Sequence, residues 1–139
     1  MSNNFLHGEC SSQIIKSFYS VYNELGFGFL EKVYQNSLIV ELKKQGFYCE
    51  KSFPIDVYYK EEKVGFYLAD ILVEKIIVVE IKAAETICIE HEAQLINYLK
   101  ATNIEVGLLL NFGKRPEFKR RVFSSEFKNI KPIQNNSKS

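Results

Sequence analysis

Cysteine and histidine are scarce in this chain of 139 residues, and their scarcity excludes a zinc-binding protein and a disulfide-rich protein. There are three cysteines, Cys10, Cys49 and Cys88, and two histidines, His7 and His91. Their positions lack the spacing of a zinc site, and an odd number of scattered cysteines does not make a disulfide framework. Free thiols are typical of a reduced compartment, so we expect the cytoplasm and read the three cysteines as ordinary core or surface groups.

Long apolar runs and an excess of charge are also missing. No apolar run approaches the length of a membrane span, and the polar residues 1–4 are unlike the start of a signal peptide. The 18 Lys and Arg residues nearly balance the 17 Asp and Glu residues, which leaves a net charge of +1. That balance gives no global field to attract nucleic acid, although it permits a local basic patch. The length predicts one domain, residues 1–127, with a polar tail at 128–139.

The pattern of apolar residues predicts a mixed α/β fold. Helical spacing predicts a helix that ends near residues 26–28, a second over 29–45 and a third over 90–101. Strands are expected at 47–53, 55–59, 64–73, 76–82, 106–112 and 119–123. Pro54 separates the first two of these strands, which suits an edge or a bend. The third helix crosses from one strand to the next, which requires a parallel pair in an otherwise antiparallel sheet with helices on both faces.

Charged residues lie at the ends of two of the most apolar runs, namely Asp70, Glu80 and Lys82. A charged side chain at the edge of a core is costly unless it is paired or binds a metal. If residues 74–76 connect the two runs as a hairpin, strand alternation places Asp70 opposite Glu80, with Cβ atoms about 5 Å apart. Two such carboxylates can share one hard cation, and we favour Mg²⁺. A strict two-residue turn would instead place them on opposite faces.

Each candidate residue also has a simpler interpretation. Asp70 and Glu80 can be surface carboxylates at strand ends, and a lysine beside them can serve only as a counter-ion. Glu31 lies near a helix start, where a carboxylate complements the helix dipole. Gln94 and Tyr98 are four residues apart on one helix face, so they can form a surface hydrogen-bonded pair. The residue pattern alone leaves these alternatives open.

Two motifs together resemble a known family. Residues 28–34 read Gly-Phe-Leu-Glu-Lys-Val-Tyr and fit the signature of the GxxExxY protein family. Asp70 with the later Glu80-Ile81-Lys82 is similar to the metal site of the PD-(D/E)XK nuclease superfamily, of which that family is a bacterial branch. The resemblance spans roughly residues 12–123, and one departure is that Ala69, rather than proline, precedes Asp70. It implies a mixed central β-sheet flanked by helices, with a restriction-endonuclease-like core.

The resemblance also implies an activity, which is metal-dependent hydrolysis of phosphodiester bonds in nucleic acid; we favour DNA over RNA, and the sequence leaves that choice open. The implied catalytic set is Glu31, Asp70, Glu80, Lys82 and Gln94. Asp70 and Glu80, with the carbonyl of Ile81, would hold Mg²⁺ or Mn²⁺. Lys82 would contact the scissile phosphate or orient the attacking water, because a positive charge there stabilises the developing charge. Glu31 would complete the acidic pocket.

A basic cluster near the end of the chain is the candidate nucleic-acid contact. Its members are Lys114, Arg115, Lys119, Arg120 and Arg121. Basic residues interleaved with Phe118 and Phe123 suit a nucleic-acid backbone, although a charge run is also typical of a solvated face. By the resemblance, Gln94 and Tyr98 line the phosphate groove. A non-catalytic module that binds nucleic acid or a protein stays the alternative, with a homodimer left open and no membrane partner expected.

Overall fold

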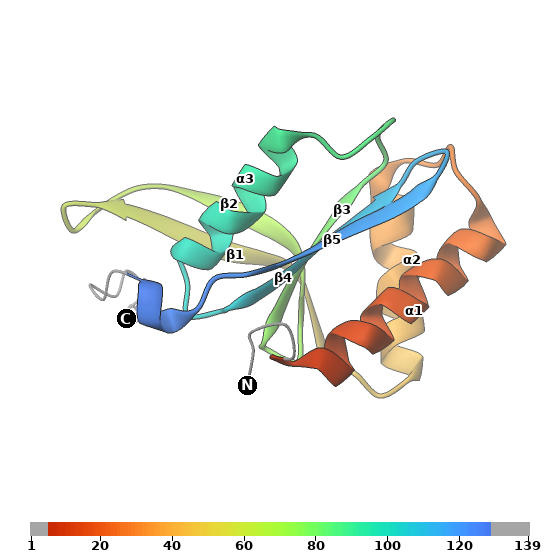
Figure 1. Ribbon diagram of the computed structural model, residues 1–139, viewed down its shortest axis with the longest axis horizontal. Helices are drawn as coiled ribbons and strands as arrows, with labels where there is room; N and C mark the ends of the chain where they lie inside the picture. The colour runs from red at the N-terminus through yellow and green to blue at the C-terminus, as the bar shows by residue number, and fades with distance from the viewer. Residues whose placement is uncertain (1–5, 129–139) are drawn as a thin grey trace.

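The computed structural model describes residues 6–128 of the chain (Figure 1). Its helices and strands are α1 (Gly8–Leu25), α2 (Glu31–Lys44), β1 (Cys49–Tyr59), β2 (Glu62–Val73), β3 (Ile77–Lys82), α3 (Ile89–Lys100), β4 (Val106–Phe112), β5 (Pro116–Val122) and the short 3-10 helix η2 (Ser125–Phe127). Residues 129–139, which hold all but the first residue of the expected polar tail, lie outside the described residues. The order of elements agrees with the one expected from the sequence, except that the separation of strands 47–53 and 55–59 at Pro54 was wrong, because both belong to β1.

The five strands form one mixed sheet in the order β1-β2-β3-β4-β5. β3 and β4 run parallel, and the other neighbouring strands are antiparallel. β1 passes through Pro54 without a break, and it can do so because it is an edge strand. A proline that lacks its N–H is tolerated at an edge. The expected mixed α/β sheet is confirmed.

Helices cover both faces of the sheet, and each covered face has its own core. Figure 1 shows α3 on one side of the sheet and α1 and α2 on the other. On the α1–α2 face, Phe18, Tyr34 and Leu38 pack with alternate residues of β3 and β4. On the opposite face, Leu95 and Tyr98 of α3 pack against the intervening residues of the same strands. All of β4 is therefore buried, as its continuous apolar run predicts.

The connection between β2 and β3 comprises residues 74–76, as the hairpin prediction requires. Glu74 and Lys75 both have positive φ angles, 53° and 60°, which let the chain reverse tightly. The β2–β3 ladder ends with Ile71 paired to Val79. The next residues in that register are Asp70 and Glu80, so the two carboxylates lie opposite one another.

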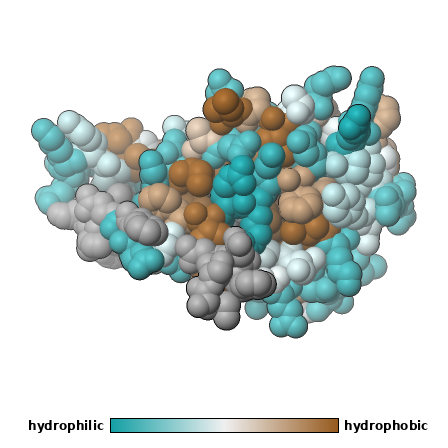
Figure 2. Space-filling model, in the orientation of Figure 1, coloured by the Kyte–Doolittle hydropathy of each residue, from teal (hydrophilic) through white to brown (hydrophobic). Residues whose placement is uncertain are grey.

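The surface mixes polar and apolar side chains. Figure 2 shows hydrophobic residues scattered among hydrophilic ones on the face it presents, rather than gathered in one broad patch. β1 and β2 extend beyond the rest of the sheet as a long hairpin (Figure 1). Of the helices in residues 6–128, none has both the length and the hydropathy that crossing a bilayer requires.

Candidate functional site

Asp70 and Glu80 hold the ends of β2 and β3 together through their carboxylates. The backbone N–H of Asp70 donates to Glu80 Oε2 over 2.9 Å. In return, the backbone N–H of Ile81 donates to Asp70 Oδ2 over 2.7 Å. Each carboxylate thus bonds the backbone of the opposite strand just beyond the last ladder pair. The arrangement brings together the two side chains that the sequence predicted would face one another.

A local break in the sheet frees the main chain of Asp70 for this arrangement. The β1–β2 ladder pairs Lys51 with Ile71 and Phe53 with Ala69, and it omits Ser52 opposite Asp70. Ser52 has a φ of 55°, which interrupts the regular strand. On β2, Ala69 packs in the same cluster as Leu72, three residues later, although residues on one face of a regular strand are an even number apart. The alternation of side chains between the two faces therefore shifts by one residue at Asp70. Breaks of this kind re-aim side chains and are frequent next to active sites.

Gln35 supports the same residue from α2. Its Nε2 donates to the carbonyl oxygen of Asp70 over 2.9 Å, and the side chain is buried. Both main-chain polar groups of Asp70 are therefore bonded by side chains, one from α2 and one from β3. Reasoning from the sequence missed Gln35. The only signal was an amide directly after the buried signature residue Tyr34.

Burial and mutual repulsion make ionisation of the acidic pair unfavourable. Glu80 is 6% exposed. Desolvation raises its pKa from 4.5 to about 8, and the charge of Asp70 adds to that rise. Desolvation also raises the pKa of Asp70, against the hydrogen bond from Ile81, and the charge of Glu31 raises it further. Two adjacent carboxylates in this environment repel each other when both are ionised, and no ion pair within residues 6–128 neutralises either one.

Lys82 acts on the pair without neutralising it. Its charge lowers the pKa of both Asp70 and Glu80, against the stronger effect of burial. Within residues 6–128, the ion pairs are Lys63 with Asp56 and Arg121 with Glu92, so Lys82 forms none with either carboxylate. The interpretation of Lys82 as a simple counter-ion in a closed ion pair does not describe this geometry. Its ammonium group stays available near the acidic pair.

The signature segment at residues 28–34 places Glu31 at the end of β3. Glu31 Oε2 accepts a hydrogen bond from the N–H of Ala83, the residue after that strand, over 3.3 Å. Tyr34 is fully buried, and its ring stacks on Phe112 with centroids 4.3 Å apart. Its hydroxyl donates to the Gly26 carbonyl over 2.6 Å and accepts from the Phe29 N–H over 3.2 Å. The signature tyrosine therefore fixes the loop that leads into Glu31.

The oxygen atoms at this site fit a hard divalent cation. No hydrogen bond from residues 6–128 reaches Asp70 Oδ1 or Glu80 Oε1, although their partner oxygens are bonded. The N–H of Ile81 points to Asp70, and the carbonyl of a strand residue points to the same side as its N–H. In the described part of the chain no three His, Cys, Asp or Glu side chains form a metal cluster. Mg²⁺ does not need one, because it keeps several waters and binds through one or two carboxylates.

The residues expected from α3 differ in their exposure. Tyr98 is 4% exposed, and its ring lies 5.8 Å from that of Tyr67, between centroids. Burial raises the pKa of Tyr98, and the charges of Glu80 and Asp70 raise it further. Its phenol therefore belongs to the core beside the acidic pair rather than to an open nucleic-acid surface. Gln94, one turn earlier, is partly exposed, and no hydrogen bond within the described residues joins it to the carboxylates.

The structure does not bring the basic cluster together as one patch. Arg120 points to the α1 side, where it donates to the Leu6 carbonyl and to Ser11 Oγ. Arg121 points to the α3 side and pairs with Glu92. Lys119 shares the α3 side because strand residues alternate between faces. Lys114 and Arg115 are exposed in the turn between β4 and β5. The cluster is thus divided between two faces and a turn.

Comparison with known proteins places this chain in a family. The fold resembles the crystal structure of SSO0001, with a TM-score of 0.52 and 22% identity over 66% of this chain. The match covers 48% of that protein, so the chain spans about half its length. No curated protein matches the sequence significantly. The model of the PD-(D/E)XK nuclease superfamily matches residues 8–122, which include the acidic pair and Lys82. The chain therefore belongs to the PD-(D/E)XK nuclease superfamily.

Proposed function

We propose that this protein is a metal-dependent nuclease of the GxxExxY branch that hydrolyses phosphodiester bonds in DNA. The observation that carries the proposal is the close pair of a buried Glu80 and a partly buried Asp70, in which each carboxylate has one oxygen that accepts no hydrogen bond from the described residues. Membership of a nuclease superfamily supports the class of reaction. The three cysteines are free thiols, which favours a reducing cytoplasm as its location.

The residues divide into those that hold a metal and those that act on the substrate. Asp70 and Glu80 supply carboxylate oxygens, and Ile81 supplies a carbonyl oxygen on the same side. Gln35 positions Asp70 by holding its main chain. When bound, Mg²⁺ or Mn²⁺ lowers the pKa of a water molecule and polarises the phosphate. The raised pKa of Glu80 means that cation binding must displace a proton near neutral pH, so affinity should increase with pH.

Lys82 and Glu31 act at the edge of this site. The Lys82 ammonium lies close enough to lower the pKa of both carboxylates, yet it is not committed to either. It is therefore available to the negative charge that develops on a phosphate in the transition state. Glu31 holds the Ala83 N–H and adds negative charge next to the pair. Gln94 is assigned to positioning of the substrate from α3.

Calorimetric titration with Mg²⁺ and Mn²⁺ tests the metal site directly. We expect Asp70→Asn to lose binding or to bind much more weakly, because a hard cation loses one of its two carboxylates. Asp56→Asn is the matched control, since Asp56 is an exposed aspartate paired with Lys63 on the β1–β2 hairpin. Affinity equal to that of the wild type in Asp70→Asn would remove the metal site. A wild-type protein that binds nucleic acid without any divalent cation would favour the non-catalytic module instead.

A further inference from the structure

A groove lies beside the acidic site, at the carboxyl ends of the two parallel strands. It has a volume of about 240 Å³, and three segments line it, residues 27–29, 83–85 and 112–114. The second and third segments follow β3 and β4, where open α/β sheets bind ligands. The groove adjoins Glu31 at the end of β3, because Ala83, which lines it, donates its N–H to Glu31.

The walls of the groove are fixed by hydrogen bonds from buried side chains. Asn111 is fully buried, accepts from the Ala84 N–H over 2.8 Å and donates to its carbonyl over 3.0 Å. A Cβ on Gly113 would lie 2.1 Å from the Ala84 oxygen, so these two segments approach as only glycine allows. The Tyr22 hydroxyl lies 2.9 Å from the Gly113 carbonyl oxygen and 2.7 Å from that of the next residue. The groove is therefore formed before any ligand arrives.

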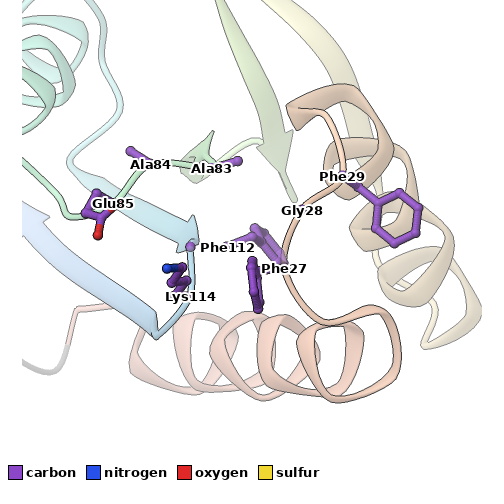
Figure 3. Close-up of a pocket in the computed structure, with 9 residues that line it drawn as sticks. Phe27, Gly28, Phe29, Ala83, Ala84, Glu85, Phe112 and Lys114 are labelled. Carbon is purple, nitrogen blue, oxygen red and sulfur yellow. The ribbon is translucent and has the colours of Figure 1, made fainter.

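The lining combines an exposed aromatic ring, a cation and a carboxylate. Figure 3 shows the ring of Phe27 and the side chain of Lys114 on one side of the groove, opposite Ala83 and Ala84, whereas the ring of Phe29 points away. Phe27 is 55% exposed. The hydroxyl of Tyr34 bonds the loop that carries Phe27, so the exposed ring is held in a fixed position. Lys114 is exposed and takes part in neither ion pair of the described residues. Glu85 completes the lining.

We propose that this groove binds one unpaired nucleotide of the DNA strand, next to the scissile phosphate. The base stacks on Phe27, its phosphate lies at Lys114, and Glu85 accepts hydrogen bonds from amino groups at the edge of the base. This inference rests on the proposed nuclease function and names its substrate class. A base inside a duplex cannot stack on a side chain, so the substrate is single-stranded or has an unpaired end.

The test measures binding of two probes by fluorescence anisotropy, a labelled oligo(dC) strand, whose bases carry an amino group, and a labelled blunt duplex. EDTA at neutral pH prevents metal-dependent cleavage of the probes during the measurement. We expect Phe27→Ala to weaken binding of the strand about ten-fold or more, which is the scale of one lost base–aromatic stack. Phe27→Tyr keeps an aromatic face and should bind like the wild type. Phe66→Ala is the matched control, because Phe66 is 57% exposed on the distant hairpin.

The outcomes of this experiment test the nucleotide-binding groove separately from the nuclease proposal on which it rests. Selective loss of strand binding in Phe27→Ala, with an unchanged melting temperature, supports the groove. Equal binding of the strand by wild type and Phe27→Ala overturns the groove and leaves the nuclease proposal standing. Equal losses in Phe27→Ala and Phe66→Ala also overturn it, since the effect is then not local. A wild-type protein that binds neither probe overturns the groove, and cleavage in Mg²⁺ then decides the nuclease proposal separately.

Discussion

Replacing Glu80 by glutamine removes a charge but keeps the shape of the side chain, and its effect on stability should depend on pH. Burial first, and then the charge of Asp70, raise the pKa of Glu80 from 4.5 to about 8 in the folded protein. Between these values the folded state holds a proton that the unfolded chain has released. The stability contributed by this carboxyl is thus fully present below pH 4.5 and is lost as the pH rises through about 8.

The size of the effect follows from the shift in pKa. At about 1.4 kcal/mol per pKa unit, a rise from 4.5 to about 8 corresponds to at most about 5 kcal/mol of free energy of unfolding. Relaxation and water penetration reduce such penalties, so we expect Glu80→Gln to gain about 1–3 kcal/mol above pH 8. For a chain of this length about 1 kcal/mol corresponds to roughly 3 °C, so the melting temperature should rise by roughly 3–10 °C.

The assay is thermal unfolding in EDTA across the range from mildly acidic to alkaline pH. Glu62→Gln, which changes an exposed carboxylate on β2, is the matched control. Adding Mg²⁺ at alkaline pH should stabilise the wild type, by about 2.7 kcal/mol at a hundred times its Kd, and leave Glu80→Gln nearly unchanged. A variant that is less stable than the wild type at alkaline pH would refute the reasoning. So would an equal gain at acidic pH, where both side chains are neutral.

Two further predictions concern the support of Asp70 and the contact with DNA. Gln35→Leu leaves the partly buried carbonyl of Asp70 without its donor. It should therefore lower the free energy of unfolding by about 1 kcal/mol and weaken Mg²⁺ binding, measured by thermal unfolding and calorimetry. Neutralising Lys114 and Arg115 together should reduce the salt dependence of DNA binding by about 0.7–0.9 per lost phosphate contact, measured by anisotropy at several salt concentrations. Arg120 should contribute little to that slope, because it is committed to partners on α1.

Controls for these two predictions lie close by in the sequence. Asn36→Ala changes the exposed neighbour of Gln35 and should alter neither stability nor metal affinity. Lys43 and Lys44 are exposed at the end of α2, and neutralising them should leave the salt slope unchanged. A Gln35→Leu protein with normal metal affinity would show that α2 does not position the site. An unchanged slope without Lys114 and Arg115 would show that the turn does not contact phosphate.

The parts of the site that follow from local periodicity could be predicted from the sequence. The side chains of a strand alternate, and a three-residue connection sets the register of the hairpin, so the meeting of Asp70 and Glu80 needed no knowledge of the remaining fold. The same alternation separates Arg120 from Arg121, so their closeness in sequence gave a misleading impression of one patch. The side chains of consecutive charged residues on a strand point to opposite faces of the sheet.

Features that depend on how distant segments pack could not be predicted in this way. The hydrogen bond from Gln35 to Asp70 depends on the docking of α2 against the sheet. The groove depends on three loops that Tyr34, Asn111 and Tyr22 hold in place from different elements. Tyr98 shares a helix face with Gln94 in the sequence, but only the packing of α3 determines that its ring is buried.

The most direct test of the nuclease proposal is single-turnover cleavage of DNA in Mg²⁺ and Mn²⁺ by the wild type and by Lys82→Met. Melting temperature and metal affinity are measured on the same samples, and Lys75→Met, at an exposed lysine in the β2–β3 connection, is the control. Methionine keeps most of the apolar stem of Lys82, so fold and metal affinity should hardly change. We expect wild-type cleavage that falls about 10²-fold or more in Lys82→Met, the scale of one lost transition-state donor. Normal cleavage by folded Lys82→Met would contradict the role of Lys82, and no cleavage by the wild type of any single-stranded or duplex substrate would contradict the nuclease itself.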